Sequence, residues 1–136
     1  MSTRTALAAL LLAAQGSGAF ACGYCVEDKL AATYDHGVVA RAKARGRAMV
    51  FTEAAGLERA ERGSAPALVA TVEAVPGVDR GTVRISAAPP TVSFSFDSDR
   101  YTVASAVSEI NRRLAGRKVA LTVLRVLDSR QMAVSK

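Results

Sequence analysis

The sequence predicts one α+β domain. Short stretches with strictly alternating polar and apolar residues, typical of half-buried strands, lie between stretches in which apolar residues recur with helical spacing. Half of the 136 residues are hydrophobic, which is too many for a disordered chain. The length fits a single domain once an N-terminal leader is subtracted.

Residues 1–21 have the pattern of a secretory signal peptide. Arg4 supplies a positive charge, an apolar run covers residues 5–14, and Ala19-Phe20-Ala21 matches the small-x-small cleavage pattern. The run is shorter than the ~20 residues that span a bilayer. We therefore expect export to the periplasm or the medium without a transmembrane segment, and a mature chain that starts at Cys22. Acylation of Cys22 is the alternative, although the residues before it fit a lipoprotein signal poorly.

Residues 22–46 combine a Cys-x-x-Cys motif with an expected helix. The apolar residues Val26, Leu30, Tyr34 and Val38 recur at every fourth position, which stacks them along one helical face. This spacing predicts a helix from about Cys25 to Arg45, with Gly37 as its weak point.

The order of elements after residue 46 predicts a ferredoxin-like fold. The expected strands cover residues 47–53, 82–87, 91–97 and 118–127, and the expected helices are capped by Ser64 and Thr102. A loop or single helical turn is expected over residues 54–63, and the second helix should end at Gly116. Together these elements give the order β-α-β-β-α-β of the ferredoxin-like sandwich over residues 47–127. Residues 128–136 are expected to be a flexible tail.

The strand expected at residues 91–97 shows the clearest alternation in the chain. Val92, Phe94 and Phe96 are expected to point into the core. Ser93 and Ser95 are expected to face solvent on the opposite side.

A turn and a strand end carry a family resemblance. Ala74-Val75-Pro76-Gly77-Val78 and Phe96-Asp97 are similar to the Pro-Gly-Val turn and the Phe-Asp pair of heavy-metal-associated (HMA-like) domains. The resemblance covers residues 47–127 and implies a ferredoxin-like fold and metal binding. That family holds its metal with a Cys-x-x-Cys motif in the loop after the first strand. Residues 52–56 of this chain, Thr-Glu-Ala-Ala-Gly, offer neither sulfur nor imidazole there, so the site cannot be carried over to this loop.

The two cysteines of the chain, Cys22 and Cys25, are the expected site of chemistry. Two nearby thiolates can bind a soft ion such as Cu(I), or can cycle between dithiol and disulfide. The positive end of the expected helix favours the thiolate form. Zn(II) is the weaker choice because four ligands are not visible. An inert N-terminal disulfide loop is the structural alternative in an oxidising compartment.

The single histidine, His36, is the candidate third metal ligand. In a continuous helix it would lie ~16 Å along the axis from Cys25. A shared ion would therefore need a bend in the chain or a dimer. An exposed histidine without a ligand role is the alternative.

Three functions are open on the sequence alone. The first is a non-enzymatic exported protein that binds a copper ion through Cys22, Cys25 and His36 and exchanges it with a metal-donor protein. The second is a thiol–disulfide exchange protein with a redox partner, in which Cys22 attacks. The third is an interaction module that docks through an open sheet face or its N-terminal helix. Basic residues cluster within positions 41–47, but nucleic-acid binding is not expected of an exported protein.

Overall fold

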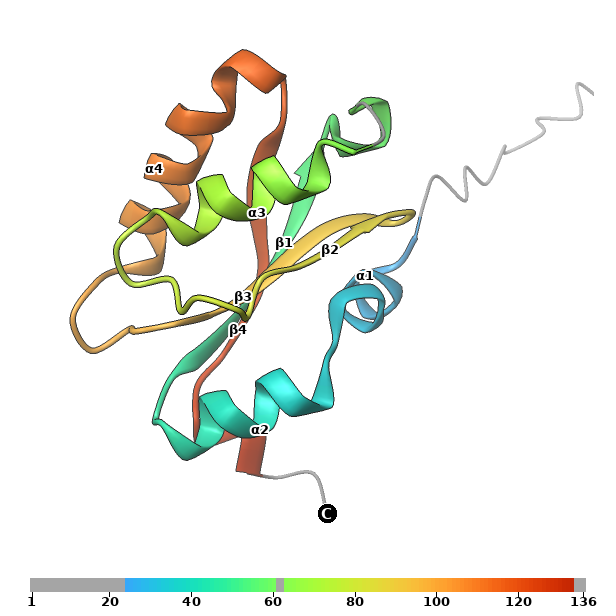
Figure 1. Ribbon diagram of the computed structural model, residues 1–136. Helices are drawn as coiled ribbons and strands as arrows, with labels where there is room; N and C mark the ends of the chain where they lie inside the picture. The colour runs from blue at the N-terminus through green and yellow to red at the C-terminus, as the bar shows by residue number, and fades with distance from the viewer. Residues whose placement is uncertain (1–23, 61–62, 134–136) are drawn as a thin grey trace, which may run out of the picture.

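The computed structural model describes residues 24–60 and 63–133, so the expected signal peptide and Cys22 lie outside the described residues. Within them, four strands form one antiparallel sheet with helices on both faces (Figure 1). The strands are β1 (Ala48–Ala55), β2 (Arg84–Ala87), β3 (Pro90–Phe96) and β4 (Ala120–Leu127). The α-helices are α1 (Val26–Thr33), α2 (His36–Ala44), α3 (Ala65–Glu73) and α4 (Val103–Leu114). Short 3₁₀ turns are η1 (Leu57–Arg59), η2 (Ala115–Arg117) and η3 (Gln131–Ala133).

The sheet has the strand order β2-β3-β1-β4, and every neighbouring pair is antiparallel. Helix α3 connects β1 to β2, a tight hairpin connects β2 to β3, and α4 connects β3 to β4. This connectivity confirms the predicted ferredoxin-like α+β fold with a preceding helical segment. No helix among the described residues has the length and apolar character that crossing a bilayer requires.

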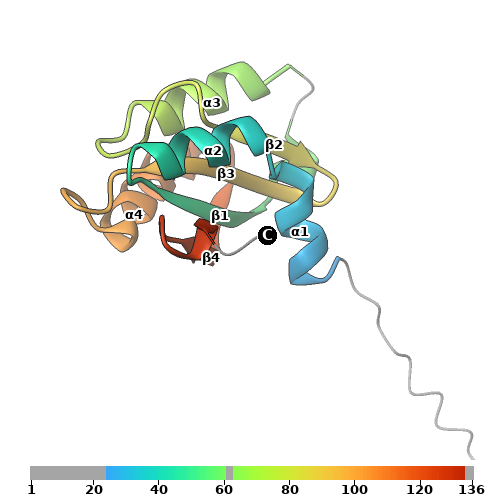
Figure 2. The ribbon, with the colours of Figure 1, turned by 90° about the horizontal axis from the view of Figure 1, so that it is seen from below.

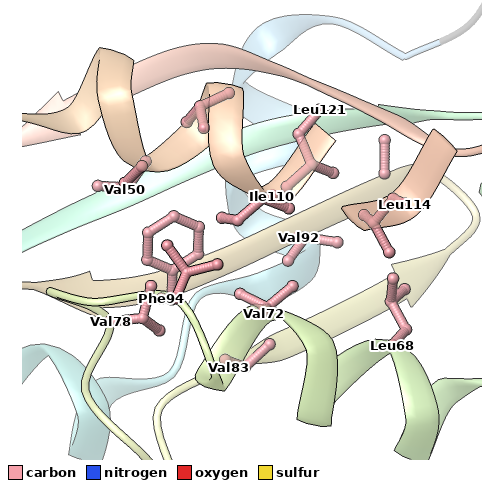
Figure 3. Packing of buried hydrophobic residues seen from close by; sticks show 14 of the residues in the cluster. Val50, Leu68, Val72, Val78, Val83, Val92, Phe94, Ile110, Leu114 and Leu121 are labelled. Atoms are coloured by element: carbon pink, nitrogen blue, oxygen red, sulfur yellow. The ribbon is translucent and has the colours of Figure 1, made fainter. Parts of the chain in front are cut away.

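The main core lies between the sheet and the layer formed by α3 and α4. Figure 3 shows side chains from both helices meeting those of the central strands. The residues at its centre are Val50, Leu68, Val72, Val92, Phe94, Ile110 and Leu114. Each such side chain contributes about 1.5–3 kcal/mol when it leaves water, so this layer supplies most of the stability. The predicted inward positions of Val92, Phe94 and Phe96 are confirmed.

A second layer, formed by α1 and α2, covers the opposite face of the sheet (Figure 1). Val38, Val39 and Ala42 of α2 pack with Met49 and Phe51, which alternate along β1 with the residues that enter the main core. The prediction of an open sheet face is therefore wrong, because these helices cover that face.

The same layer corrects the expectation for Ser93 and Ser95. Both side chains lie on the face opposite the main core, as the alternation requires, but they are only 0% and 1% exposed. The Ser93 hydroxyl donates to the carbonyl oxygen of Thr33 at 3.1 Å. The Ser95 hydroxyl donates to the carboxylate of Asp79 at 2.7 Å. The prediction of solvent-facing serines is wrong because α1 and α2 cover them.

The single helix expected from Cys25 to Arg45 is two helices. Figure 2 shows α1 and α2 set at an angle to each other, and the break falls at Tyr34 and Asp35 rather than at Gly37. Asp35 has an extended backbone, and its carboxylate accepts a hydrogen bond from the Val38 N–H at 3.0 Å. An aspartate at this position starts a new helix, and Gly37 is accommodated inside it.

Several boundaries differ from the sequence prediction. Strand β1 continues past the expected Glu53 to Ala55, and η1 occupies part of the expected loop. The turn after α4 is completed by Lys118, which adopts the left-handed conformation expected of Gly116. The tail is not loose throughout, because Met132 of η3 packs against the second layer.

The Pro-Gly turn after α3 is held against the end of β3. The carbonyl oxygen of Gly77 accepts a hydrogen bond from the Asp97 N–H at 2.8 Å. Gly77 has φ +96°, and an added Cβ would lie 2.5 Å from the Phe96 ring. Asp97 in turn forms an ion pair with Arg47 at 2.6 Å. The residues that carry the family resemblance thus form one contact, and only glycine fits at its centre.

We expect Gly77→Ala to destabilise the protein far more than Gly81→Ala. Both glycines have positive φ, but an added Cβ at Gly81 meets nothing within 4 Å. Gly81→Ala should therefore cost only the backbone term of ~1–2 kcal/mol, whereas Gly77→Ala also displaces the Phe96 ring. Urea unfolding of both variants measures the difference, and equal losses would contradict this account of the turn.

Candidate functional site

Cys25 starts helix α1 and is exposed to solvent. Its backbone is extended, and its sulfur accepts a hydrogen bond from the Asp28 N–H at 3.5 Å. Its thiol donates to the Asp28 carboxylate at 3.1 Å. The sulfur thus takes the place of the oxygen that usually caps a helix. Cys22 lies outside the described residues, three positions before this thiol.

Tyr24, inside the Cys-x-x-Cys motif, borders a groove between α1 and the β2–β3 turn. Its side chain is 47% exposed. The groove, which we call the hairpin-side groove, measures about 570 Å³ and is also lined by Asp28, Ala32, Ser86 and Pro89. The exposed sulfur of Cys25 therefore lies near an open depression, because its hydrogen-bond partner Asp28 lines that groove.

His36 is exposed at the first position of α2. Its ring makes an edge-to-face contact with Tyr34 at 4.9 Å, and Tyr34 stacks parallel to Phe51 at 6.4 Å. These three residues line a second groove of about 590 Å³, the β4-side groove, whose rim carries Glu27 and Arg125.

The structure does not bring His36 to Cys25. The two residues lie at opposite ends of α1, and an eight-residue helix is ~12 Å long. Metal–sulfur and metal–nitrogen bonds of ~2.3 and ~2.0 Å cannot bridge that separation within one chain. In residues 24–60 and 63–133, no three His, Cys, Asp or Glu side chains converge as a metal site.

Sequence reasoning missed Asp28 as a neighbour of the thiol. The signal was present, because the third residue after a helix cap is the one whose N–H the cap accepts. It also missed the ion pair between Glu27 and Arg125 at 2.9 Å, which joins α1 to β4. No local pattern could have found this pair, since the partners are 98 positions apart.

The basic residues expected as one cluster divide into two groups. Arg41, Lys43 and Arg45 are exposed and form no ion pair with any described residue. Arg47 is partly buried and bound to Asp97. The first three are a cationic surface of α2, and the fourth belongs to the fold.

Helix α1 is held on the sheet mostly by polar contacts, among them a hydrogen bond from the Ser93 hydroxyl to the Thr33 carbonyl oxygen at 3.1 Å. Leu30 is its only apolar side chain that is buried, at 8% exposed, and contributes about 2 kcal/mol. Lys29 pairs with Glu53 at 2.9 Å, and Glu27 pairs with Arg125 at the same distance. Ion pairs with exposed members add at most ~1 kcal/mol each. Of the four α-helices, the thiol-bearing helix therefore buries the fewest apolar side chains.

The start of α2, unlike α1, is anchored by Asp35. Its carboxylate accepts from the Val38 N–H and forms an ion pair with Arg84 of β2 at 2.9 Å. The Val38 N–H first, and then Arg84, lower the pKa of Asp35 below its ordinary value, although partial burial opposes them. Asp35 thus ties α2 to the sheet as a charged group.

The depressed pKa of Asp35 predicts an acid-dependent loss of stability. Its favourable contribution is complete above its unfolded pKa of about 4 and disappears as the pH falls through the lower folded value. Asp35→Asn keeps a helix cap but loses the charge, so it should melt below the wild type at pH 7, with the gap narrowing below about pH 4. Thermal melts between pH 7 and pH 2 measure the gap. Asp99→Asn, which changes an exposed acid, is the control; a gap independent of pH would contradict the assignment.

No protein-family model matches this chain, and neither a curated protein nor a solved structure matches it.

Proposed function

We propose that this chain is a small exported, non-enzymatic protein that binds a soft metal ion, Cu(I), through Cys22 and Cys25. One observation carries the proposal: the Cys25 thiol is exposed at the start of α1, three positions after the only other cysteine. Two thiolates at this spacing suit the low coordination number of Cu(I). His36 is not needed for such a site.

The surroundings of Cys25 supply part of the required chemistry. The thiols must lose their protons on binding. The Asp28 N–H donates a hydrogen bond to the sulfur of Cys25, and the same bond can be made to a thiolate. A Cu(I) ion held by two thiolates is exchanged by attack of a third thiolate, so the expected partner is a metal-donor or acceptor protein with accessible sulfur.

The Asp28 carboxylate offers a test between Cu(I) and Zn(II). Its carboxylate lies 3.1 Å from the sulfur of Cys25. An oxygen donor beside two sulfurs suits Zn(II), which also accepts carboxylate ligands, better than Cu(I). If Cu(I) is the natural ion, Asp28→Asn should leave its affinity unchanged or raise it, because a negative charge beside an anionic complex is removed.

The resemblance to HMA-like domains also supports metal binding, and the shared fold is compatible with it. The loop that carries ligands in that family contains no Cys or His among its described residues here. The proposal therefore places the metal on the added N-terminal segment.

We expect the reduced mature protein to take Cu(I) from a competing chelator, and the Cys22→Ser, Cys25→Ser double variant to fail. Loss of both ligands should weaken binding by more than the ~10–100-fold that loss of an outer-shell contact costs. His36→Gln is the matched control, because it changes the third candidate ligand without touching the thiols. Equal binding by the wild type and the double variant would exclude the proposal, and weakened binding by His36→Gln would restore His36 as a ligand.

Thiol–disulfide exchange is the second candidate, and the exposure of Cys25 favours it over an inert loop. An exchange protein should have a reduction potential between about −270 and −120 mV, whereas a structural disulfide lies below about −300 mV. Equilibration of the Cys22–Cys25 pair with glutathione measures this potential. A value below −300 mV would exclude exchange, and if copper binding also fails, a protein-interaction module remains.

A further inference from the structure

Helix α1 stands between two grooves. The hairpin-side groove of about 570 Å³ and the β4-side groove of about 590 Å³ share Ala31 as a lining residue, so they flank the same helix. Figure 2 shows α1 at the margin of the sheet, next to the described N-terminus. Its attachment therefore depends on the face that touches strands β1, β2 and β3.

That face is mostly polar. Thr33 is only 4% exposed, yet its hydroxyl has no hydrogen-bond partner among the described residues. The sheet beneath presents Thr91 and Ser93, both buried. An unpaired buried hydroxyl regains a hydrogen bond to water when the contact opens. Lifting α1 would replace the hydrogen bond from the Ser93 hydroxyl to the Thr33 carbonyl oxygen by hydrogen bonds to water and would hydrate the Thr33 hydroxyl. Leu30 is the only buried apolar side chain of the helix that would lose its contacts.

Helix α2 is attached differently. Val38, Val39 and Ala42 are buried in the second layer, and Asp35 ties its start to Arg84. The residues between the helices, Tyr34 and Asp35, have extended backbones. A helix held mainly by polar contacts thus meets one held by buried apolar side chains at a non-helical junction, which is the arrangement of a hinge.

We propose that α1 is a strap that lifts off the sheet about Tyr34 and Asp35 while α2 and the ferredoxin-like domain stay folded. Lifting carries Cys25 away from the surface of the domain. Its use in handing a metal ion to a partner's thiols rests on the function proposed above, whereas the lifting itself does not. The part of the sheet that becomes exposed when α1 lifts can tolerate brief contact with water, because it consists largely of hydroxyl groups.

Native-state hydrogen exchange tests the strap. The Lys29 N–H, bonded to the Cys25 carbonyl, and the Tyr34 N–H, bonded to the Ala31 carbonyl, report α1. We expect their protection factors to be at least ~10-fold lower than those of β1 and β3 amides, and nearly independent of low urea concentrations, as for local opening. Protection equal to that of β1, with the same urea dependence, would overturn the proposal.

Two variants sharpen this test. Thr33→Val removes the unpaired hydroxyl at nearly constant volume and should raise the protection of α1 severalfold. Leu30→Ala should lower it, and both variants should change the protection of α1 more than that of β1. Should Leu30→Ala fail to fold, Thr33→Val and the effect of salt still decide, because screening of the Lys29 and Glu27 ion pairs should speed exchange in α1 more than in β1. Equal effects on α1 and β1 would overturn the proposal.

The kinetics of Cu(I) transfer distinguish the strap proposal from the metal-binding proposal. If both proposals hold, Thr33→Val should slow Cu(I) transfer to a dithiol acceptor severalfold, with little change in equilibrium affinity. Local exchange in α1 without any copper binding would reject the metal function and keep the strap. Copper transfer at wild-type rates in Thr33→Val, despite its greater protection, would reject the strap as the route of delivery.

Discussion

Strand β1 buries both of its faces, and the rest of the architecture depends on this constraint. Val50 and Ala54 enter the main core, whereas Met49 and Phe51 enter the second layer. A ferredoxin-like sheet covered by two helices on one side would leave Met49 and Phe51 in water. The added segment before residue 46 removes that exposed surface, so it is a structural part of the domain as well as the carrier of the thiols.

The two added helices differ in how they cover this second face of the sheet. β1 offers apolar side chains on the second face, but β3 offers Thr91, Ser93 and Ser95. Helix α2 contacts the apolar strand through Val38, Val39 and Ala42. Helix α1 lies mainly on β3, where hydroxyl groups return less free energy on burial than apolar side chains do. The difference in attachment between the two helices therefore follows from the composition of the strands beneath them.

The fold could be predicted because its signals are local. The alternation from Val92 to Phe96 and the cap at Thr102, whose hydroxyl accepts from the Ser105 N–H, identify a strand and a helix without reference to distant residues. The burial of Ser93 could not be predicted, because alternation gives the face on which a residue lies and not what covers that face. The break at Asp35 was visible in principle, since aspartate is a strong helix cap.

The candidate site was predictable to a smaller degree. The sequence predicts that a helix starts at Cys25. Once Cys25 is the helix cap, its contact with the Asp28 N–H follows, because a cap accepts from the N–H three positions later. The separation from His36 was also expected, because a continuous helix already placed the two residues ~16 Å apart along its axis. What was not predicted is the position of the break between α1 and α2. The ion pairs of Lys29, Glu27 and Asp35 with Glu53, Arg125 and Arg84 join residues far apart in the chain. Such pairs appear only once the sheet order is known.

The position of the thiols also has a steric rationale. The turn after β1 passes so close to the start of β4 that a Cβ on Gly56 would collide with the carbonyl oxygen of Lys118. Side chains added at this point would disturb the contact between the central strand and its neighbour. A segment that precedes the sheet has no such restriction, because α1 touches the domain through one face only. Reactive groups at its start can therefore be exposed, and can move, at little cost to the core that holds the sheet together.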